Sequence, residues 1–476
     1  MNGFKLNTQN DNIFIINLSE IEKRLDPNPY HIERLAEIEK LQKLDCKKLK
    51  SVVIPSKSQT GSIRENDIYI GLENIKSNTG EYIKTKEKES ISSANIFKSG
   101  QILFPKLRPY LNKVFLAEFD GICSTEFHVF NAKNINAEYL AIYLRSSFVV
   151  NQTKHLMTGN TLPRLQTDDI NNIPVPIISD ELQQQIVNLY NEEFEKKQQK
   201  EKEAKDLLAS IDGYLLDELC IELPEKDNSL ENRIFTASIS EISGGRFDPK
   251  LYDNFTSALR LSIKENKYKS DNLRLKDLLT QSFAGSWGED ELKFSEDENY
   301  KKCLVIRATE FDNKYNLDVD NSRVKYRLIP RKKLQTLDIQ TNDLLIEKSG
   351  GSPDQPVGRI SIVTEEMINN HSLCYSNFIH KIRIDTDICN PIYLFNYLKT
   401  VHNIKLTDAM QSQTNGIRNL IMSNYFNQTI PIPPKEKQTE IASHITDLRN
   451  QAKQLELDAD QIMTEAKAEV ENIILG

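Results

Sequence analysis

The sequence predicts an α+β protein made of two similar modules, each of which is followed by a long helix. Three observations predict this class: several passages occur twice, short apolar runs lie between turn signals, and two long charge-rich stretches have helical periodicity. Strands and helices do not alternate regularly, as they would in a nucleotide-binding sheet. A chain of 476 residues is also too long for one ordinary core, so we expect two domains.

The duplication is the most informative of these observations. The offset between the two copies grows along the chain, as expected when a duplicated unit acquires loop insertions. The duplicated passages are Arg24 to Tyr30 with Arg246 to Tyr252, Tyr139 to Leu144 with Tyr393 to Leu398, Thr158 to Leu162 with Gln413 to Ile417, and Ile173-Pro174-Val175-Pro176 before Gln183 with Ile430-Pro431-Ile432-Pro433 before Gln438.

The first module is predicted to span residues 1–179. Short runs rich in β-branched and aromatic residues predict strands at Ser51–Pro55, Ile68–Gly71 and Gln101–Pro105. A helix is predicted from Glu138 to Ser147, because its Tyr and Leu residues recur on one face.

A long helix is predicted over residues 180–223. It is apolar near both ends, but its centre, from Glu195 to Glu203, contains no apolar residue. We expect this central stretch to face either a partner protein or solvent.

The second module is predicted to span residues 224–434 and to repeat the organisation of the first. Its predicted strands are Cys303–Ile306, Leu344–Ile346 and Arg359–Val363, and its matching helix begins near Pro391.

A second long helix is predicted over residues 435–476. Its apolar residues recur at alternating spacings of four and three, with one lapse at Glu469, which predicts a coiled-coil seam. The seam residues are Ile441, Ile445, Leu448, Ala452, Leu455, Ala459, Ile462, Ala466 and Ile473. We expect the two long helices to form an antiparallel coiled coil. The alternative is that each helix covers only its own module.

The composition limits the classes of protein that fit. No apolar stretch approaches the ~20 residues needed to cross a bilayer, and the N-terminus lacks the pattern of a secretion signal. The scattered cysteines and histidines have no metal-ligand spacing. We expect a cytoplasmic protein with reduced thiols, no metal site and no membrane contact.

The net charge of −8 argues against a nucleic-acid partner, but the charge is uneven. Between Tyr300 and Gln335, ten Lys and Arg residues stand against four Asp and Glu residues. Such a window is most often a solvated face, and DNA contact is the alternative.

Motifs for catalysis are missing from the sequence. It contains no Walker A motif and no G-x-S-x-G. Asp26-Pro27-Asn28-Pro29-Tyr30 lacks the Pro-Pro of a loop that holds a flipped base, and Asp343 with Glu347-Lys348 lacks the Glu-x-Lys spacing of a nuclease. We therefore expect no catalytic centre.

Two α+β modules, each followed by Ile-Pro-x-Pro, a spaced glutamine and a long helix, resemble the specificity (S) subunit of a type I restriction–modification system. The resemblance covers essentially the whole chain, and the repeated passage before each helix is its most specific part. It implies that each module is a target recognition domain that reads one half of a split DNA site. It also implies that an antiparallel coiled coil sets the spacer between the half-sites.

The resemblance further implies the partners. Two modification (methyltransferase) subunits would dock on the coiled coil, and restriction (motor-nuclease) subunits would join the complex on double-stranded DNA. S-adenosylmethionine, ATP and Mg would be bound by these subunits, so the chain itself is expected to be non-catalytic and without a cofactor.

Reading a base requires fixed donors and acceptors, whereas a phosphate contact requires only positive charge. Candidates therefore lie where basic or amide side chains follow a strand or occupy a glycine-containing loop, and each has the alternative of an ordinary surface or turn residue. They are Lys106, Arg108, Asn160 and Arg164 in the first module, and Lys325, Arg327, Lys348, Ser349, Asn415 and Arg418 in the second.

Two other functions stay open at this point. A coiled-coil interaction scaffold without DNA binding would leave the duplicated α+β modules unexplained. A nuclease or methyltransferase of unfamiliar type would have no motif to support it.

Overall fold

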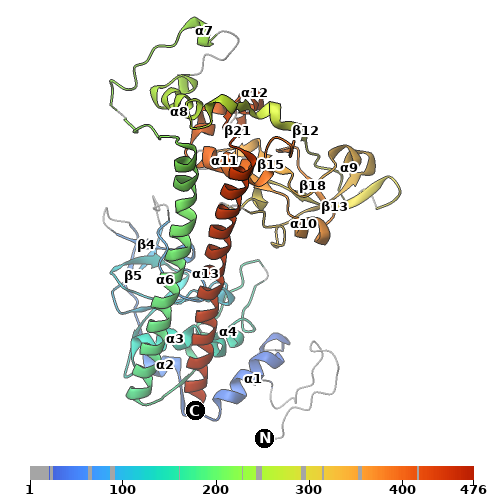
Figure 1. Cartoon of the computed structure of the whole chain (residues 1–476). Helices are drawn as coiled ribbons and strands as arrows, with labels where there is room; N and C mark the ends of the chain where they lie inside the picture. The colour runs from blue at the N-terminus through green and yellow to red at the C-terminus, as the bar shows by residue number, and fades with distance from the viewer. Residues whose placement is uncertain are drawn as a thin grey trace. The chain divides into compact units, whose positions relative to one another are not determined.

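The computed structural model describes residues 21, 25–62, 67–85, 92–159, 161–227, 229–242, 249–290, 296–312, 316–351, 356–414 and 417–476. Contacts divide the chain into two compact units (Figure 1). Unit 1 comprises Met1–Glu201 with Glu456–Gly476, and unit 2 comprises Lys202–Leu455. Each unit therefore holds one module with one end of each long helix, so the unit boundaries lie within the helices.

The described part of unit 1 contains two four-stranded sheets and a two-stranded ribbon, β1-β10. The first sheet has the antiparallel order β2-β9-β6-β7. The second has the order β3-β5-β8-β4, in which β4 runs parallel to β8. The strands are β1 (Cys46–Lys48), β2 (Val53–Pro55), β3 (Gln59–Thr60), β4 (Tyr69–Ile70), β5 (Ala94–Phe97), β6 (Ile102–Pro105), β7 (Phe115–Leu116), β8 (Gly121–Ser124), β9 (Phe127–Ala132) and β10 (Pro174–Pro176).

Short helices surround these sheets. They are α1 (Ile32–Leu41), α2 (Leu49–Val52), α3 (Ala137–Leu144), α4 (Ser147–Thr153) and α5 (Thr167–Asn171). The strand predicted at Ser51–Pro55 begins only at Val53. Its first two residues belong to α2, because Leu49 and Val52, three residues apart, are buried together on one helical turn.

Unit 2 repeats the plan with a four-stranded sheet, β12-β19-β15-β17, and a ribbon, β11-β22. Two three-stranded sheets, β14-β13-β18 and β16-β21-β20, complete its described part. The strands are β11 (Leu273–Arg274), β12 (Leu279–Ala284), β13 (Tyr300–Ile306), β14 (Tyr326–Pro330), β15 (Leu344–Glu347), β16 (Ser349–Gly351), β17 (Ile360–Ile362), β18 (Leu373–Tyr375), β19 (Ile379–Ile384), β20 (Gln411–Thr414), β21 (Ile417–Leu420) and β22 (Thr429–Ile430). The helices are α7 (Ile239–Ile242), α8 (Asn254–Lys264), α9 (Arg331–Leu337), α10 (Glu365–Asn370), α11 (Pro391–Asn403) and α12 (Met422–Phe426).

The two units share most of their sheet plan, as the duplication predicts, although the described part of unit 1 has no sheet that corresponds to β16-β21-β20. The order β2-β9-β6-β7 matches β12-β19-β15-β17, and β1-β10 matches β11-β22. The parallel pair β4-β8 likewise matches β13-β18. The units differ in the strand added to that pair, because β5 pairs with β8 in unit 1 whereas β14 pairs with β13 in unit 2.

The duplicated tyrosine and glutamine residues attach each long helix to its module. In unit 1, the Gln183 side-chain oxygen accepts the Asn136 N–H at 2.9 Å, and its amide group donates to the Ile178 carbonyl at 3.0 Å. The Tyr139 hydroxyl donates to the Pro176 carbonyl at 3.1 Å. Asn136 is the N-cap of α3, so the glutamine links the start of one helix to the start of another.

Unit 2 contains the same contacts. Gln438 accepts the Asn390 N–H at 2.7 Å and donates to the Pro433 carbonyl at 2.8 Å. The Tyr393 hydroxyl donates to the Pro431 carbonyl at 2.9 Å. Asn390 is the N-cap of α11, and Gln438 is 1% exposed, so this amide is buried with its hydrogen bonds made.

These contacts correct the alignment of the two proline passages. They superpose Pro176 on Pro431, whereas the Ile-Pro-x-Pro pattern alone superposes Pro174 on Pro431. Alternating prolines repeat every two residues, as the faces of a strand do, so a shift by two leaves the pattern unchanged. The sequence therefore identifies the passage correctly but places it two residues out of register.

The long helices are α6 (Asp180–Leu219) and α13 (Lys435–Leu475). In unit 1 the start of α6 shares a core with the end of α13, through Ile186, Tyr190 and Val470. In unit 2 the end of α6 shares a core with the start of α13, through Ile211 and Ile441. The helices are therefore antiparallel, as predicted. No helix among the described residues is both long enough and apolar enough to cross a membrane.

The seam of α13 departs from a strict heptad in its second half. Met463, Val470 and Ile474 are buried there, whereas the predicted Ile462 and Ile473 are only partly buried. This end of α13 packs on α3 and α4 as well as on α6, because all three helices contribute to the same core. A heptad expectation assumes a single facing helix, which explains the error.

The polar centre of α6, from Glu195 to Glu203, was expected to face a partner protein or solvent, but one of its residues does neither. Lys197 occupies the buried face with 2% of its side chain exposed, and it pairs with Glu81 at 2.7 Å and Glu201 at 2.8 Å. Lys76 joins the same carboxylates at 3.5 and 2.8 Å. The rest of the stretch is mostly exposed, so its one buried cation is neutralised by its own module.

Candidate nucleic-acid interface

Lys106 and Lys348 occupy equivalent positions where three backbone segments meet. In unit 1, the Lys106 N–H donates to Glu126 at 2.8 Å, and its carbonyl accepts the Leu165 N–H at 2.9 Å. In unit 2, the Lys348 N–H donates to Phe378 at 2.9 Å, and its carbonyl accepts from Leu420 at 2.7 Å. We call each arrangement a lysine junction.

The backbone passes through a positive φ two residues after each lysine, although Arg108 starts a short 3-10 turn and Gly350 lies at a bulge in strand β16. Arg108 has a φ of 49° and Gly350 a φ of 115°, and each lies two residues beyond its lysine. Positive φ is easy only for glycine, so this turn is held in unit 1 by the hydrogen bond from the Arg108 N–H to the Pro163 carbonyl at 2.9 Å. A side chain at Gly350 would meet nothing within 4 Å. Arg108 and Gly350 are both exposed, so a ligand can approach the backbone closely at these two positions.

The structure brings Arg164 to the first junction, but it is paired. Its guanidinium makes two hydrogen bonds to Glu126, at 3.0 and 2.7 Å. Burial lowers the pKa of Lys106, and the negative charge of Glu126 offsets only part of that lowering. DNA binding through Arg164 would require exchange of this exposed ion pair for a phosphate or base, which costs little in water.

The second junction lacks the corresponding carboxylate. The position of Glu126 is taken by Phe378, whose side chain is 49% exposed. The position of Arg164 is taken by Asn419, which pairs with Ser349 across β16 and β21. Arg418 therefore lies one residue before the true counterpart of Arg164.

Ser349 and Arg418 have roles in the sheet. Ser349 is 8% exposed and pairs with Asn419, and Arg418 pairs with Gly351. Asn160 and Asn415, which are equivalent in the repeat, lie outside the described residues.

The basic window around Lys325 and Arg327 lies on a different sheet, β14-β13-β18. Arg327 donates to Asp290 at 3.1 Å and its guanidinium lies 5.2 Å from the centre of the Trp287 ring. Lys325 is exposed. Arg327 is thus engaged with its own unit, and Trp287 packs against it.

Each junction also contains a half-buried histidine, which the sequence interpretation missed. Burial, and secondarily the charge of Lys106, lowers the pKa of His128 to about 4. Burial and Lys348 do the same to His380, again to about 4. Both imidazoles are therefore neutral at pH 7. The shared Ser-x-x-x-His spacing of Ser124 to His128 and of Ser376 to His380 could have identified them.

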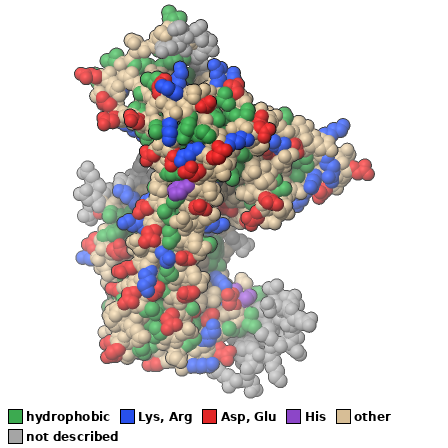
Figure 2. Space-filling model, in the orientation of Figure 1, with side chains coloured by type: hydrophobic (Ala, Val, Ile, Leu, Met, Phe, Trp, Pro, Cys, Tyr) green, Lys and Arg blue, Asp and Glu red, His purple; other side chains and the backbone are tan. Residues whose placement is uncertain are grey.

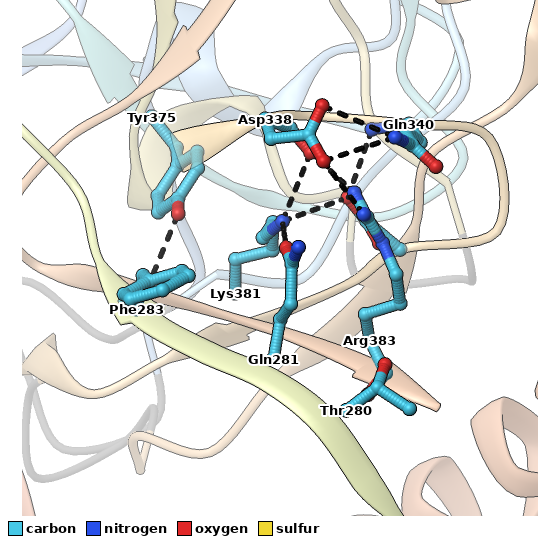
Figure 3. A network of polar contacts seen from close by, with 9 residues as sticks. Thr280, Gln281, Phe283, Asp338, Gln340, Tyr375, Lys381 and Arg383 are labelled. Atoms are coloured by element: carbon cyan, nitrogen blue, oxygen red, sulfur yellow. Dashed lines mark hydrogen bonds and ion pairs between the residues drawn. The ribbon is translucent and has the colours of Figure 1, made fainter. Parts of the chain in front are cut away.

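The carboxylates that weakly suggested a nuclease are structural. Asp343 accepts two hydrogen bonds from Arg383, at 2.8 and 3.0 Å, and lies 3.2 Å from Lys381. Figure 3 shows these two basic residues in their network of polar contacts. Glu347 pairs with Arg359 at 2.8 Å. Both carboxylates are 1% exposed. Both charges are balanced within unit 2: Asp343 links the start of β15 to β19 through Lys381 and Arg383, and Glu347 links the end of β15 to Arg359, the residue before β17.

Asp338 belongs to the same network of polar contacts (Figure 3). A hydrogen bond from Arg383, at 2.7 Å, is the main cause that lowers the pKa of its carboxyl group. Lys381 also donates to Gln281 at 2.8 Å. Two basic residues of β19 therefore stabilise the sheet, and they are not available to a ligand.

One group of described side chains has metal-ligating atoms close together, namely His31, Glu33 and His155. The two rings stack with centres 4.0 Å apart. The Glu33 carboxylate is bound by Lys154 at 2.5 Å and by His155 at 2.9 Å, so contacts within the chain account for both oxygens.

Figure 2 shows Lys and Arg side chains interspersed with Asp and Glu across the visible face of both units. This agrees with the net charge of −8. A binding site for a negatively charged ligand therefore depends on individual basic residues at particular positions, such as those at the lysine junctions.

Comparison with known proteins identifies the family. The model of the type I restriction modification DNA specificity domain matches residues 34–205 and 269–461, one match in each module. The type I restriction enzyme EcoDI specificity subunit of Escherichia coli is 30% identical over 163 residues, which are 34% of this chain and 36% of that subunit. The alignment thus spans only about a third of that relative.

Solved structures that resemble this chain include a chain from a study of type I R-M complex assembly, with a TM-score of 0.49, 18% identity and coverage of 90% of this chain and 96% of that one. The HsdS subunit from Thermoanaerobacter tengcongensis has a TM-score of 0.34 and 19% identity, over 90% and 95% of the two chains. The S subunit from M. genitalium has a TM-score of 0.39 and 12% identity, also over 90% and 95%. The assignment rests on the family match, which covers most of the sequence in two separate segments. The chain therefore belongs to the family of type I restriction modification DNA specificity domains.

Proposed function

We propose that this chain is the DNA-reading specificity subunit of a type I restriction–modification complex. Each module reads one half of a split site on double-stranded DNA, and the paired long helices set the distance between the halves. The observation that supports this most directly is the twin lysine junction: a lysine with matching backbone hydrogen bonds, followed two residues later by an exposed residue of positive φ, occurs once in each module.

The junctions suit contact with DNA for a physical reason. A lysine at the end of a sheet supplies positive charge, and a turn with positive φ lets backbone N–H and carbonyl groups approach a groove closely. Neighbouring amide or guanidinium groups, such as Asn419 in unit 2 and Arg164 in unit 1, suit adenine and guanine respectively. The modules carry different groups at this one position, as two readers of different half-sites would.

The chemistry is assigned to other subunits. We propose that two modification subunits supply S-adenosylmethionine-dependent methylation, and that restriction subunits supply ATP hydrolysis and cleavage with Mg. The buried, cation-paired Asp343 and Glu347 support a chain that does not itself cleave DNA.

DNA binding by the full chain, alone and with the modification subunit, tests this function. We expect the double variant Lys106→Ala/Lys348→Ala to weaken binding of a duplex that carries the target site, and to lower the salt dependence of binding by about two phosphate contacts. Lys47→Ala removes one exposed charge from the ribbon β1-β10 and serves as the control. Unchanged binding by the double variant, or loss only in Lys47→Ala, would exclude the junctions as the DNA contact.

A further inference from the structure

A cavity of about 460 Å³ opens in unit 1, where the first module packs on α6. Its wall includes residues of α3 and α6, which share a core and lie side by side in Figure 1. This volume is within the range of pockets that bind small molecules. We call it the α3–α6 cavity. The lining residues that decide its chemistry are Glu118, Glu138, Ile142, Arg145, Tyr190 and Phe194.

The guanidinium of Arg145 lines this cavity, although the residue is only 9% exposed. Its Nη1 donates to the Thr79 carbonyl at 2.5 Å, and the group lies 5.3 Å from the centre of the Tyr190 ring. Among the described residues, no carboxylate forms an ion pair with it and its Nε–H has no acceptor. A buried positive charge costs free energy unless an anion or further acceptors compensate it. The cavity beside Arg145 is therefore where an anion would be stabilised.

A second buried polar group lies next to this guanidinium. Tyr190 is 4% exposed, and its hydroxyl group has no hydrogen-bond partner among the described residues. A buried hydroxyl is normally hydrogen-bonded, because water no longer solvates it. Arg145 and Tyr190 thus offer two unused donors, from α3 and α6 respectively, to one ligand.

The surroundings of Arg145 are positive on the side of α13. Burial, and secondarily the charge of Arg145, lowers the pKa of Lys467 on α13 to about 8. Glu471 acts on Lys467 in the opposite direction, but its two oxygens accept from the Ser147 N–H and hydroxyl, at 2.6 and 2.8 Å. A carboxylate at Arg145 would therefore meet a second positive charge nearby.

Aromatic and aliphatic side chains form the rest of the wall. The rings of Tyr190 and Phe194, one helical turn apart on α6, are stacked with centres 6.2 Å apart and planes 12° apart. Ile142 contributes from α3. Flat rings gain both area and favourable stacking against such surfaces. The apolar part of a ligand is expected to be flat.

Carboxylates in the lining limit the charge of the ligand. Glu81 is bound by Lys197 at 2.7 Å, whereas Glu118 and Glu138 are exposed, so water solvates them. Glu138 lies seven positions before Arg145, which is about 10 Å along α3 at 1.5 Å per residue. A single carboxylate at Arg145 stays clear of these charges, whereas a polyphosphate or a nucleic-acid backbone would be repelled by them.

We propose that the α3–α6 cavity binds a small monocarboxylate with a flat apolar body. Arg145 Nε and the Tyr190 hydroxyl donate to its carboxylate, and the rings of Tyr190 and Phe194 cover its body. Hydrogen bonds between a guanidinium and a carboxylate are among the strong ones, because both groups are charged. Such a ligand contacts α3 and α6 together, so its binding strengthens the attachment of the first module to its long helix. The inference does not depend on the proposed function.

Three probes of one shape and different charge test this proposal by isothermal titration calorimetry on the full chain. They are 3-phenylpropionate, its neutral amide 3-phenylpropanamide, and the cation 3-phenylpropylamine. The acid is expected to bind once per chain, with a dissociation constant of about 1 mM or below for a probe of this size. The amide and the amine are each expected to bind at least about tenfold more weakly, since neither carries a negative charge to Arg145.

Two substitutions in the cavity test its residues. Tyr190→Phe removes one hydroxyl group and keeps the ring, and is expected to weaken binding of the acid about threefold to tenfold. Arg145→Gln keeps a donor but removes the charge, and is expected to weaken it at least about tenfold. Circular dichroism verifies the fold of both variants. Should Arg145→Gln unfold, Tyr190→Phe decides alone.

Tyr110→Phe and Lys50→Gln are the matched controls, because both residues are exposed in unit 1 and neither lines the cavity. Both variants should bind 3-phenylpropionate as the wild type does. The proposal is overturned if the acid shows no saturable binding below about 10 mM. It is equally overturned if the amide or the amine binds as tightly as the acid, if Tyr190→Phe keeps the wild-type affinity, or if a control loses it.

The outcomes also separate this inference from the proposed function. A chain that binds 3-phenylpropionate but no DNA contradicts the proposed function and leaves the cavity as a carboxylate site. A chain that binds DNA but not the acid contradicts the carboxylate site alone.

Discussion

The sequence predicts Lys106 and Lys348 as DNA contacts because each follows a predicted strand, and the structure places them at matching junctions. The histidines beside them do not stand out in either module alone, and the Ser-x-x-x-His spacing becomes visible only when the two modules are aligned. Arg327 was selected because of its basic neighbours, but its guanidinium is used by Asp290 and Trp287. The local sequence predicts where a charged residue lies relative to a strand. It does not predict which residues bind that side chain, because those residues come from elements distant in the chain.

The half-buried His380 predicts a pH dependence of stability. Burial lowers its pKa to about 4 in the folded chain, from an ordinary value of 6.5. The unfolded chain therefore binds more protons between these values, so the stabilisation from the neutral ring is complete above pH 6.5 and is lost as the pH falls toward 4. Trp287, the only tryptophan, lies in unit 2 and reports its unfolding by fluorescence.

We expect the wild-type unfolding temperature of unit 2 to fall over this pH range, and to fall less in His380→Asn. The comparison is between slopes, because the substitution also removes the 2.8 Å contact with Ser282. Parallel slopes for the two proteins would mean that His380 titrates normally in the folded chain.

The buried hydrogen bonds of Gln438 predict that its replacement lowers the stability of unit 2 at neutral pH. Replacement by Ala leaves the Asn390 N–H and the Pro433 carbonyl without this partner in a buried site. We expect a loss of about 1–3 kcal/mol in the free energy of unfolding, measured by urea titration with Trp287 fluorescence. Gln451→Ala, on an exposed position of the same helix, should change it by less than about 0.5 kcal/mol. Equal losses of unfolding free energy in the two variants would show that Gln438 does not stabilise the attachment of the helix to its module.

At the scale of elements, the sequence predicts a helix or strand best where its apolar pattern matches the surfaces that bury it in the structure. The helix starting at Pro391 and the strand Leu344–Glu347 lie where predicted, because the helix is buried in one core and the continuously apolar strand is buried on both faces, between two cores. The register of the proline passages and the second half of the α13 seam were wrong, because both depend on which element faces them. The environment of the polar centre of α6 could not be predicted either, since Lys197 is paired with Glu81, which lies far away in the sequence.

The antiparallel helix pair predicts how the spacer of the DNA site is determined. One heptad added to both α6 and α13, within their central stretches, adds about 10 Å along the pair at 1.5 Å per residue. Since each base pair rises about 3.4 Å, the spacer in the methylated site is expected to grow by about three base pairs, with both half-sites unchanged.

Sequencing of methylated adenines in cells that carry the lengthened chain with its partner subunits measures this spacer. Insertion of a heptad into α6 alone is the control, and should reduce methylation instead, because it breaks the pairing of the helices. An unchanged spacer in the double insertion would show that the helices do not set it.

At the scale of the whole molecule, the duplication is what the sequence establishes most firmly. Two units share strand orders, ribbons and the glutamine contacts at the start of each long helix. They differ in the strand that joins the parallel pair and in the side chains at the junctions. The shared parts are those that attach modules to helices, and the different parts are those proposed to read DNA. Which bases are read depends on loop contacts that no repeat pattern encodes.

The central claim is that each module reads its own half-site independently. Exchange of residues 1–179 for the corresponding module of another specificity subunit, followed by mapping of methylated adenines across the genome, tests it most directly. The account predicts that one half-site changes to that of the donor, while the other half-site and the spacer remain. A change in both half-sites, or an unchanged methylated sequence, would contradict it.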